Sequence, residues 1–144
     1  MAGSKKFWDR IAKRYEKKPV GDEAAYQRKL ATTREYFRPD MELLEIGCGT
    51  GSTAIAHAPY VAHIRATDIS EKMIEIAKGK ATEAGVQNVT FEAVAIDDLG
   101  VASESVDAVL ALSLLHLLED KKAVIARIHD MLRPEGIFVS NTVC

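Results

Sequence analysis

One stretch decides the fold of this 144-residue chain: Leu43-Leu44-Glu45-Ile46-Gly47-Cys48-Gly49-Thr50-Gly51. A short apolar strand runs directly into three glycines, and the helix Ser52–Ala58 follows until Pro59 stops it. A turn without Cβ atoms lets a ligand approach the backbone, and the first N–H groups of the next helix suit an anionic group. In an open parallel sheet, ligands bind at the carboxyl ends of the strands. The stretch therefore predicts a ligand-binding turn, with a purely structural turn as the alternative.

Strands and helices alternate downstream of this turn. Ser70 and Gly85 are placed to cap the longest helix at its start and at its end. The residues Pro134-Glu135-Gly136 predict a turn into the last strand. The predicted strands are Glu42–Ile46, His63–Thr67, Val89–Val94, Val106–Leu112 and Ile137–Val143, and the predicted helices are Ser52–Ala58, Ser70–Ala84 and Asp120–Leu132. This alternation predicts an α/β fold with a parallel sheet and right-handed crossovers.

The residues before the first strand predict two further helices. Apolar side chains recur at helical spacing in Phe7–Tyr15, and a second helix begins near Asp22 and closes at Pro39. We therefore expect a single domain over residues 1–144, in which a helical lid (1–40) precedes an α/β core (41–144).

Composition excludes several classes of protein. Apolar residues make up 47% and charged residues 28% of the chain, which is ordinary for a globular domain. The start lacks the apolar segment of a signal peptide and no run is long enough to span a bilayer, so we expect a cytoplasmic protein without a membrane span. Cys48 and Cys144 fit neither a zinc spacing nor a disulfide framework, and the four histidines form no ligand cluster, so no metal site is predicted.

The net charge of −2 is unevenly distributed. The first eighteen residues carry seven Lys/Arg and two acids, and the remainder is acidic. The basic start indicates a solvated helix face or a lid over an anionic group. The acidic remainder, without an interleaved aromatic and basic platform, argues against nucleic acid and favours a small-molecule partner.

The spacing of the glycines indicates which class of ligand the turn binds. The dinucleotide fingerprint is G-x-G-x-x-G, but here the glycines are Gly47, Gly49 and Gly51, and Ser52 stands where the third dinucleotide glycine would fall. A nicotinamide-dependent oxidoreductase is therefore the less favoured enzyme class. The run E-I-G-C-G-T-G resembles motif I of class I S-adenosylmethionine-dependent methyltransferases, and the resemblance covers roughly Phe7 to Val143. It implies a Rossmann-like sheet of order 3-2-1-4-5 with helices on both faces, and S-adenosylmethionine as cofactor.

Two acids stand next to this turn. Asp68 ends the second strand, 17 residues after Gly51, where an acid can accept both hydrogens of a ribose diol, and an exposed loop aspartate is the alternative. In the resembled family the next side chain, here Ile69, packs on adenine. Glu45 is an acid in a buried strand, which is costly unless it is paired. The resemblance implies that it organises the loop and reaches toward the cofactor's amino group, and a carboxylate that caps its own loop is the alternative.

The resemblance is weaker at the residues that would contact the adenine ring. The family often shows a glycine and an acid where this chain has Val94 and Ala95. Ile96 remains, through its backbone N–H, and so does Asp97, as an acceptor for the exocyclic amine. Leu112 stands at the cofactor end of the fourth strand. The predicted cofactor-binding residues are Tyr15, Glu45, Gly47, Cys48, Gly49, Gly51, Asp68, Ile69, Ile96, Asp97 and Leu112.

The N-terminal run F-W-D-R-I-A-K-R-Y, residues 7–15, is similar to the lead segment of ubiquinone/menaquinone-biosynthesis-type small-molecule methyltransferases. There it folds over the methionine end of the cofactor. Tyr15, Tyr26, Arg28 and Lys29 are accordingly candidate contacts, with ordinary surface or packing as the alternative for each.

The implied chemistry is methyl transfer by in-line displacement to an acceptor that the sequence does not identify. Orientation alone can supply roughly 7–11 kcal/mol of such a barrier, so no nucleophilic triad is needed. A general base is needed only for a protonated acceptor, and His116 is the candidate, with a packed histidine as the alternative.

The resembled family commonly continues with a helix and two more strands, the sixth and seventh, which this sequence lacks. We expect either a fragment of a longer protein or a naturally short chain that completes its sheet with a partner. A cofactor-binding subunit without catalysis is the corresponding alternative function. The segment Ile137–Val143 contains no proline or charged residue, so its free edge should pair with a second copy or another partner, and methyl transfer by this chain should be weak or absent.

Overall fold

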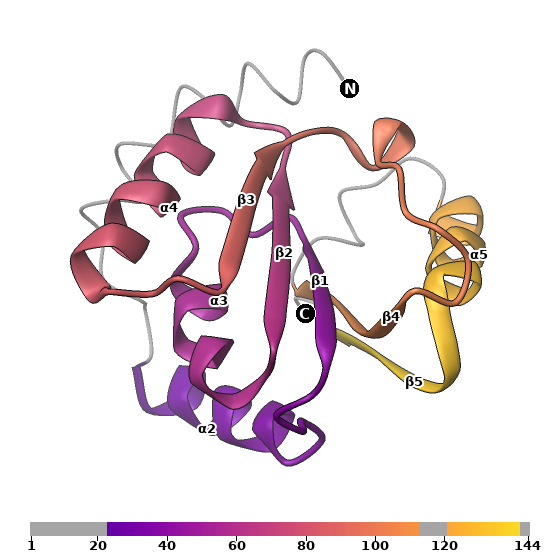
Figure 1. The fold of residues 1–144 in the computed structure, drawn as a ribbon, viewed down its shortest axis with the longest axis horizontal. Helices are drawn as coiled ribbons and strands as arrows, with labels where there is room; N and C mark the ends of the chain where they lie inside the picture. Colours follow the sequence, from indigo (N-terminus) through magenta and orange to yellow (C-terminus); the bar gives the residue numbers. More distant parts are fainter. Residues whose placement is uncertain (1–22, 113–120, 142–144) are drawn as a thin grey trace.

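The computed structural model describes residues 23–112 and 121–141 (Figure 1). Within these residues, five parallel strands form one sheet in the order β3-β2-β1-β4-β5. The strands are β1 (Glu42–Ile46), β2 (His63–Asp68), β3 (Val89–Ala93), β4 (Val106–Leu112) and β5 (Leu132–Asn141). The predicted α/β class, parallel sheet and strand order are confirmed.

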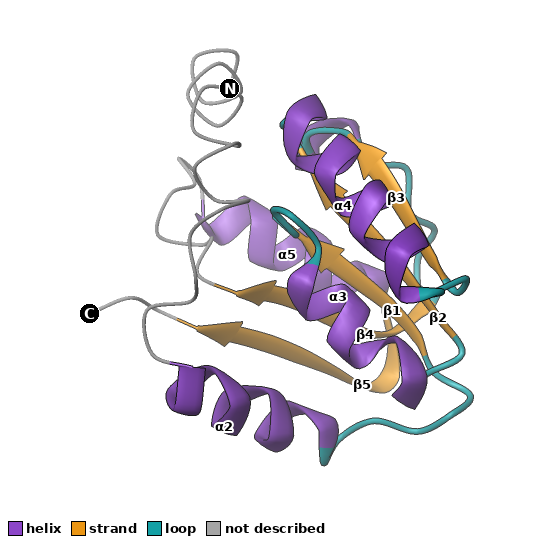
Figure 2. Ribbon diagram, turned by 90° about the vertical axis from the view of Figure 1, so that its left-hand side faces the viewer, coloured by secondary structure: helices purple, strands orange, loops and turns teal. Residues whose placement is uncertain are grey.

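Helices cover both faces of the sheet (Figure 2). The helices are α2 (Glu23–Arg34), α3 (Ser52–His57), α4 (Glu71–Ala84) and α5 (Lys121–Met131), with short 3-10 helices η1 (Ala58–Tyr60) and η2 (Ile96–Asp98). In α4, the Ser70 hydroxyl accepts a hydrogen bond from the Met73 N–H at 3.2 Å, and Gly85 ends the helix at φ 71°, as predicted. The predicted helix over residues 7–15 lies outside the described residues.

Each face has its own apolar core. Leu43, Ile64 and Ala77 belong to the core beneath α3 and α4, and Leu44, Val109 and Ile128 belong to the core beneath α5. Helices α3 and α4 connect β1 to β2 to β3 on one face, whereas α5 connects β4 to β5 on the other. Strands are therefore added to one side of β1 first and to its other side from β4 onward. Ligands in open parallel sheets bind at the carboxyl ends of the strands at such a topological switch point, here between β1 and β4.

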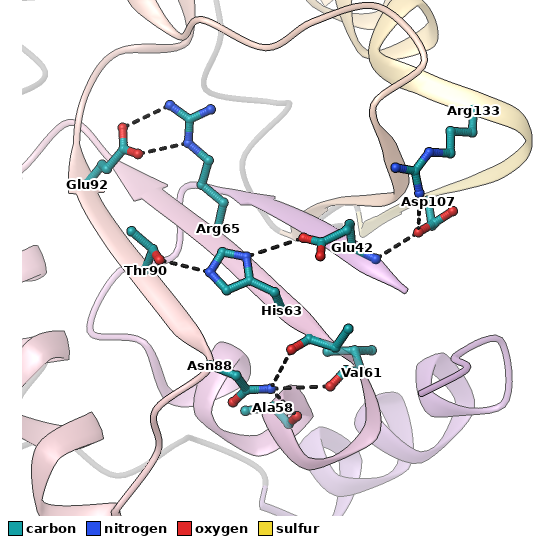
Figure 3. A network of polar contacts seen from close by, with 11 residues as sticks. Glu42, Ala58, Val61, His63, Arg65, Asn88, Thr90, Glu92, Asp107 and Arg133 are labelled. Carbon is teal, nitrogen blue, oxygen red and sulfur yellow. Dashed lines mark hydrogen bonds and ion pairs between the residues drawn. The ribbon is translucent and has the colours of Figure 1, made fainter. Parts of the chain in front are cut away.

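One half of the α5-side face carries polar side chains (Figure 3). Arg65 is the register partner of Leu44, so its side chain points to the same face as that of Leu44. There it forms a bidentate ion pair with Glu92, with N···O distances of 2.9 and 3.0 Å. His63 contacts Glu42 at 3.4 Å and Thr90 at 2.8 Å. No described helix crosses this part of the sheet, because η2 is the only helical segment between β3 and β4. These side chains therefore satisfy one another at a partly exposed surface.

The start of β5 differs from the prediction. Pro134 to Gly136 were expected to form a turn before a strand at 137–143, but β5 begins at Leu132 directly after α5. Leu132 pairs with Val106, the register then shifts, and pairing resumes at Ile137. Four residues of β5 lie between these two pairs, against one residue of β4, and Glu135 has a φ of 70°. The predicted turn residues therefore interrupt the ladder, and regular pairing begins at Ile137, the predicted start of the strand. The predicted end of the strand, at 143, lies outside the described residues.

Candidate functional site

The glycine turn after β1 adopts a backbone that favours glycine at three positions. Gly47, Gly49 and Gly51 have φ values of 73°, 58° and 83°. A Cβ atom on Gly51 would lie 2.9 Å from the Cβ of Ala77 and 3.0 Å from the ring of Phe91. At Gly49, by contrast, no described atom lies within 4 Å of such a Cβ. Gly51 thus allows the turn to pack on α4 and β3, and Gly49 leaves open space beside the backbone.

Asp68 fixes the turn from the end of β2. One carboxylate oxygen accepts the N–H of Gly49 at 2.9 Å, and the other accepts the N–H of Ser70 at 2.9 Å. The Cys48 N–H also donates to the Thr67 carbonyl at 2.9 Å. The predicted neighbourhood of Asp68 and the glycines is therefore present, and the carboxylate has a role in shaping the loop that the sequence did not reveal.

Glu45 is a buried carboxylate below this turn. The residue is only 4% exposed, and its Oε1 has no hydrogen-bond partner among the described residues. Burial, followed by the negative charge of Asp68, raises the pKa of Glu45 to about 8. A buried acid without a partner costs free energy, so this oxygen is suited to meet a cationic ligand group.

A cavity of about 610 Å³ opens above Glu45. Its walls come from the glycine turn, from α2 and from the end of β5. Tyr26 joins α2 to α3 through a 3.0 Å hydrogen bond between its hydroxyl and that of Thr53. Arg28 and Lys29 add exposed cations to the α2 side. The volume is in the range of small-molecule sites, which span roughly 300–1,000 Å³.

The remaining predicted residues that the structure describes do not line this cavity. Ile69 follows Asp68 and is half-buried, and Asp97 is exposed on η2. The Ile96 side chain packs in the α5-side core, so its backbone N–H is the group left for a ligand. Leu112 is the last residue of β4. Neither Tyr15 nor His116 falls among the described residues.

A lysine that the sequence analysis did not single out also contacts the turn. The ammonium group of Lys80, on α4, lies 3.2 Å from the Thr50 hydroxyl and 2.5 Å from the Ser52 hydroxyl. No local pattern could reveal this contact, because the partners are 30 and 28 residues away in the sequence.

His57 is buried away from this cavity, between α2 and α3. The residue is 1% exposed. Its ring packs edge-on against Phe37 at 4.9 Å. Burial, followed by the charge of Arg34, lowers the pKa of His57 to about 4. This histidine is therefore a buried, neutral group of the α2–α3 interface at neutral pH.

Metal-binding clusters and membrane-spanning helices are both absent from the described residues. They contain no group of three or more His, Cys, Asp or Glu side chains arranged to hold a metal ion. No helix in residues 23–112 or 121–141 is both long and apolar enough to cross a bilayer.

Known proteins are similar to this chain in sequence and in fold. Residues 37–144 match the family described as Methyltransferase domain. An uncharacterized methyltransferase, YcgJ of Bacillus subtilis, is 30% identical over 102 residues, which cover 71% of this chain and 40% of that protein. A ubiquinone biosynthesis O-methyltransferase of Sinorhizobium fredii is 35% identical over 103 residues, with 72% and 41% covered. This chain therefore spans about 40% of the length of these curated relatives.

Solved structures with a similar fold include a methyltransferase relative already named and a cyclase. The crystal structure of YcgJ superposes with a TM-score of 0.75 at 28% identity, covering 79% of this chain and 50% of that one. A structure named as the [4+2]-cyclase SpnF superposes with a TM-score of 0.76 at 28% identity, covering 82% and 45%.

Proposed function

This chain belongs to the family of S-adenosylmethionine-dependent methyltransferases, and on that basis we propose that the cavity above Glu45 holds the methionine end of S-adenosylmethionine for methyl transfer. The glycine turn and Asp68 would hold the nucleoside end. When bound, S-adenosylmethionine supplies a methyl group already activated on a sulfonium.

The observation that carries this proposal is the Glu45 oxygen below the turn, which has no hydrogen-bond partner among the described residues. An ammonium group is the natural counterpart of a buried carboxylate, because it supplies both charge and hydrogen-bond donors. A cation at this position would favour the ionised form of Glu45, which burial otherwise disfavours. The exposed cations of Arg28 and Lys29, on the α2 wall of the cavity, suit the carboxylate of the same amino-acid group.

Asp68 and Gly49 support the placement of the ribose. A carboxylate offers about four acceptor sites, so holding two backbone N–H groups is compatible with accepting from a diol. The open space beside Gly49 admits a ligand against the backbone. Ile69, Ile96 and Asp97 remain our proposed residues for the adenine side, and Leu112 remains our proposed cofactor contact at the end of β4.

This chain's own residues would contribute chiefly by binding and orienting the reactants. Holding two reactants in line can supply roughly 7–11 kcal/mol, without a nucleophile from the protein. His116 remains the proposed base for an acceptor that must lose a proton. We propose that α2, with the residues before it, acts as the lid on this site, because it supplies one wall of the cavity.

A small molecule is the acceptor that we propose. The net charge of −2 disfavours nucleic acid, and the similarity to a ubiquinone biosynthesis O-methyltransferase favours a small acceptor. The cavity volume of about 610 Å³ accommodates a small molecule beside the methionine group.

Calorimetry tests the cofactor assignment. We expect S-adenosylmethionine and S-adenosylhomocysteine to bind and NAD not to bind. Glu45→Gln should weaken S-adenosylhomocysteine binding by about tenfold to a hundredfold, because a charge-assisted hydrogen bond is worth roughly 1.5–3 kcal/mol. Binding of NAD in place of S-adenosylhomocysteine would overturn the proposal.

A non-methylating role is the second candidate, because a similar structure carries the name of a [4+2]-cyclase. A cofactor-binding subunit that completes its sheet with a partner belongs to the same candidate. Formation of S-adenosylhomocysteine, followed with a panel of phenols, amines and thiols, separates the two. Tight cofactor binding with no product from any acceptor would favour the non-methylating role.

A further inference from the structure

We propose that Lys80 is a positioning residue that holds the glycine turn in its ligand-binding shape from the α4 side. The consequence for cofactor affinity rests on the function proposed above, whereas the effect on the turn itself does not.

The contact is made to both sides of Gly51. The Lys80 ammonium donates to the hydroxyl of Thr50 at 3.2 Å and to that of Ser52 at 2.5 Å. These two residues flank the glycine that starts α3. One cation therefore bridges the residue before Gly51 and the first residue of the helix, and it restrains their relative orientation.

The face of α4 that carries Lys80 is the face on which the turn packs. Ala77 lies three residues before Lys80, a spacing that places both side chains on one side of a helix. The Cβ of Ala77 leaves no room for a side chain at Gly51. Apolar contact from Ala77 and hydrogen bonds from Lys80 thus act on adjacent points of the same turn. The Asp68 carboxylate holds Gly49 from the other side.

Stabilisation of α3 itself does not explain the lysine. The N-cap residue of α3 is Gly51, which has no side chain to accept from the first N–H groups. A cation near the N-terminus of a helix is electrostatically unfavourable, because that end carries partial positive charge. The two hydroxyl contacts offset this cost, so what Lys80 contributes is the shape of the turn rather than the stability of the helix.

The test compares three variants of the full chain: Lys80→Met, Lys80→Arg and Lys78→Met. Lys78 is the matched control, since it is an exposed lysine on the same helix. Hydrogen exchange at the Gly49 and Gly51 amides, both hydrogen-bonded in the structure, reports the turn without any ligand. S-adenosylhomocysteine titration reports the consequence for binding.

We expect Lys80→Met to speed exchange at these amides and to weaken S-adenosylhomocysteine binding by roughly three- to tenfold, the worth of one or two ordinary hydrogen bonds. Lys80→Arg should restore both, and Lys78→Met should change neither. Unchanged exchange in Lys80→Met would overturn the proposal, and so would wild-type affinity of that variant. If the wild-type protein binds no S-adenosylhomocysteine, the cofactor assignment fails and the exchange measurement alone decides the role of Lys80.

Discussion

The free energy of unfolding should depend on pH through two buried groups with opposite effects. Glu45 and His57 have pKa values of about 8 and about 4 in the folded protein, against 4.5 and 6.5 for the unperturbed groups. We therefore expect stability to be nearly flat between pH 4.5 and 6.5 and to fall by about 2 kcal/mol between pH 6.5 and 8, at about 1.4 kcal/mol per pH unit and bound proton.

Glu45 destabilises the fold as pH rises. Between pH 4.5 and 8 the folded state keeps a proton on this carboxyl that the unfolded chain has lost. Its contribution is therefore fully present below pH 4.5 and is lost as pH rises through about 8, for a total of about 5 kcal/mol.

His57 has the opposite sign. Between pH 6.5 and 4 the unfolded chain binds a proton that the buried ring does not bind. Its contribution is fully present above pH 6.5 and is lost as pH falls through about 4, for a total of about 3 kcal/mol. The two effects cancel where their ranges overlap, and only the effect of Glu45 remains above pH 6.5.

Urea denaturation followed by circular dichroism at a series of pH values can separate the two groups. In Glu45→Gln, stability should rise by about 3 kcal/mol from pH 4 to 6.5 and then level off, since only His57 still titrates. In His57→Met, stability should fall by about 5 kcal/mol from pH 4.5 to 8. The double variant should be flat. A flat profile in either single variant would refute this reasoning.

Three further predictions concern the turn and the sheet. Asp68→Ala should weaken S-adenosylhomocysteine binding by about tenfold to a hundredfold in calorimetry, because it removes a charged acceptor, and unchanged affinity would place the ribose elsewhere. Gly51→Ala should lower the thermal midpoint more than Gly49→Ala, because both incur roughly 1–2 kcal/mol of left-handed strain but only the former meets Ala77 and Phe91; equal midpoints would contradict the packing argument. Sedimentation should show self-association at high concentration, because β5 pairs only with β4 among the described strands. A monomer at every concentration would count against pairing between copies at the β5 edge.

The parts of the fold that were predicted correctly have strong local signals. The predicted bounds of β1 and β4 match the structure, because each is a compact apolar run between turn residues or charges. Ser70 and Gly85 cap α4 as predicted, since both act within one helical turn. Regular pairing of β5 with β4 begins at the predicted residue, Ile137, but the earlier start of the strand was missed because the pairing of Leu132 with Val106 is a contact between distant residues.

In the site, too, local sequence signals could be predicted and contacts between distant residues could not. Asp68 could be placed beside the glycines because the carboxyl ends of neighbouring parallel strands meet at one edge of the sheet. Its bonds to the Gly49 and Ser70 amides could not be predicted, because they depend on the local backbone. Lys80 was missed because a lysine on an amphipathic helix looks like any solvated charge until its partners in the turn are known.

The polar half-face formed by Arg65, Glu92 and their neighbours constrains how this family can diversify. A relative with a longer segment between β3 and β4 could place a helix over this face. Burying Arg65 or Glu92 after losing the other would leave an uncompensated charge, at a cost of roughly 3–5 kcal/mol. The two positions should therefore coevolve, changing together to apolar residues wherever such an insertion has occurred and remaining a charge pair wherever the connection is short.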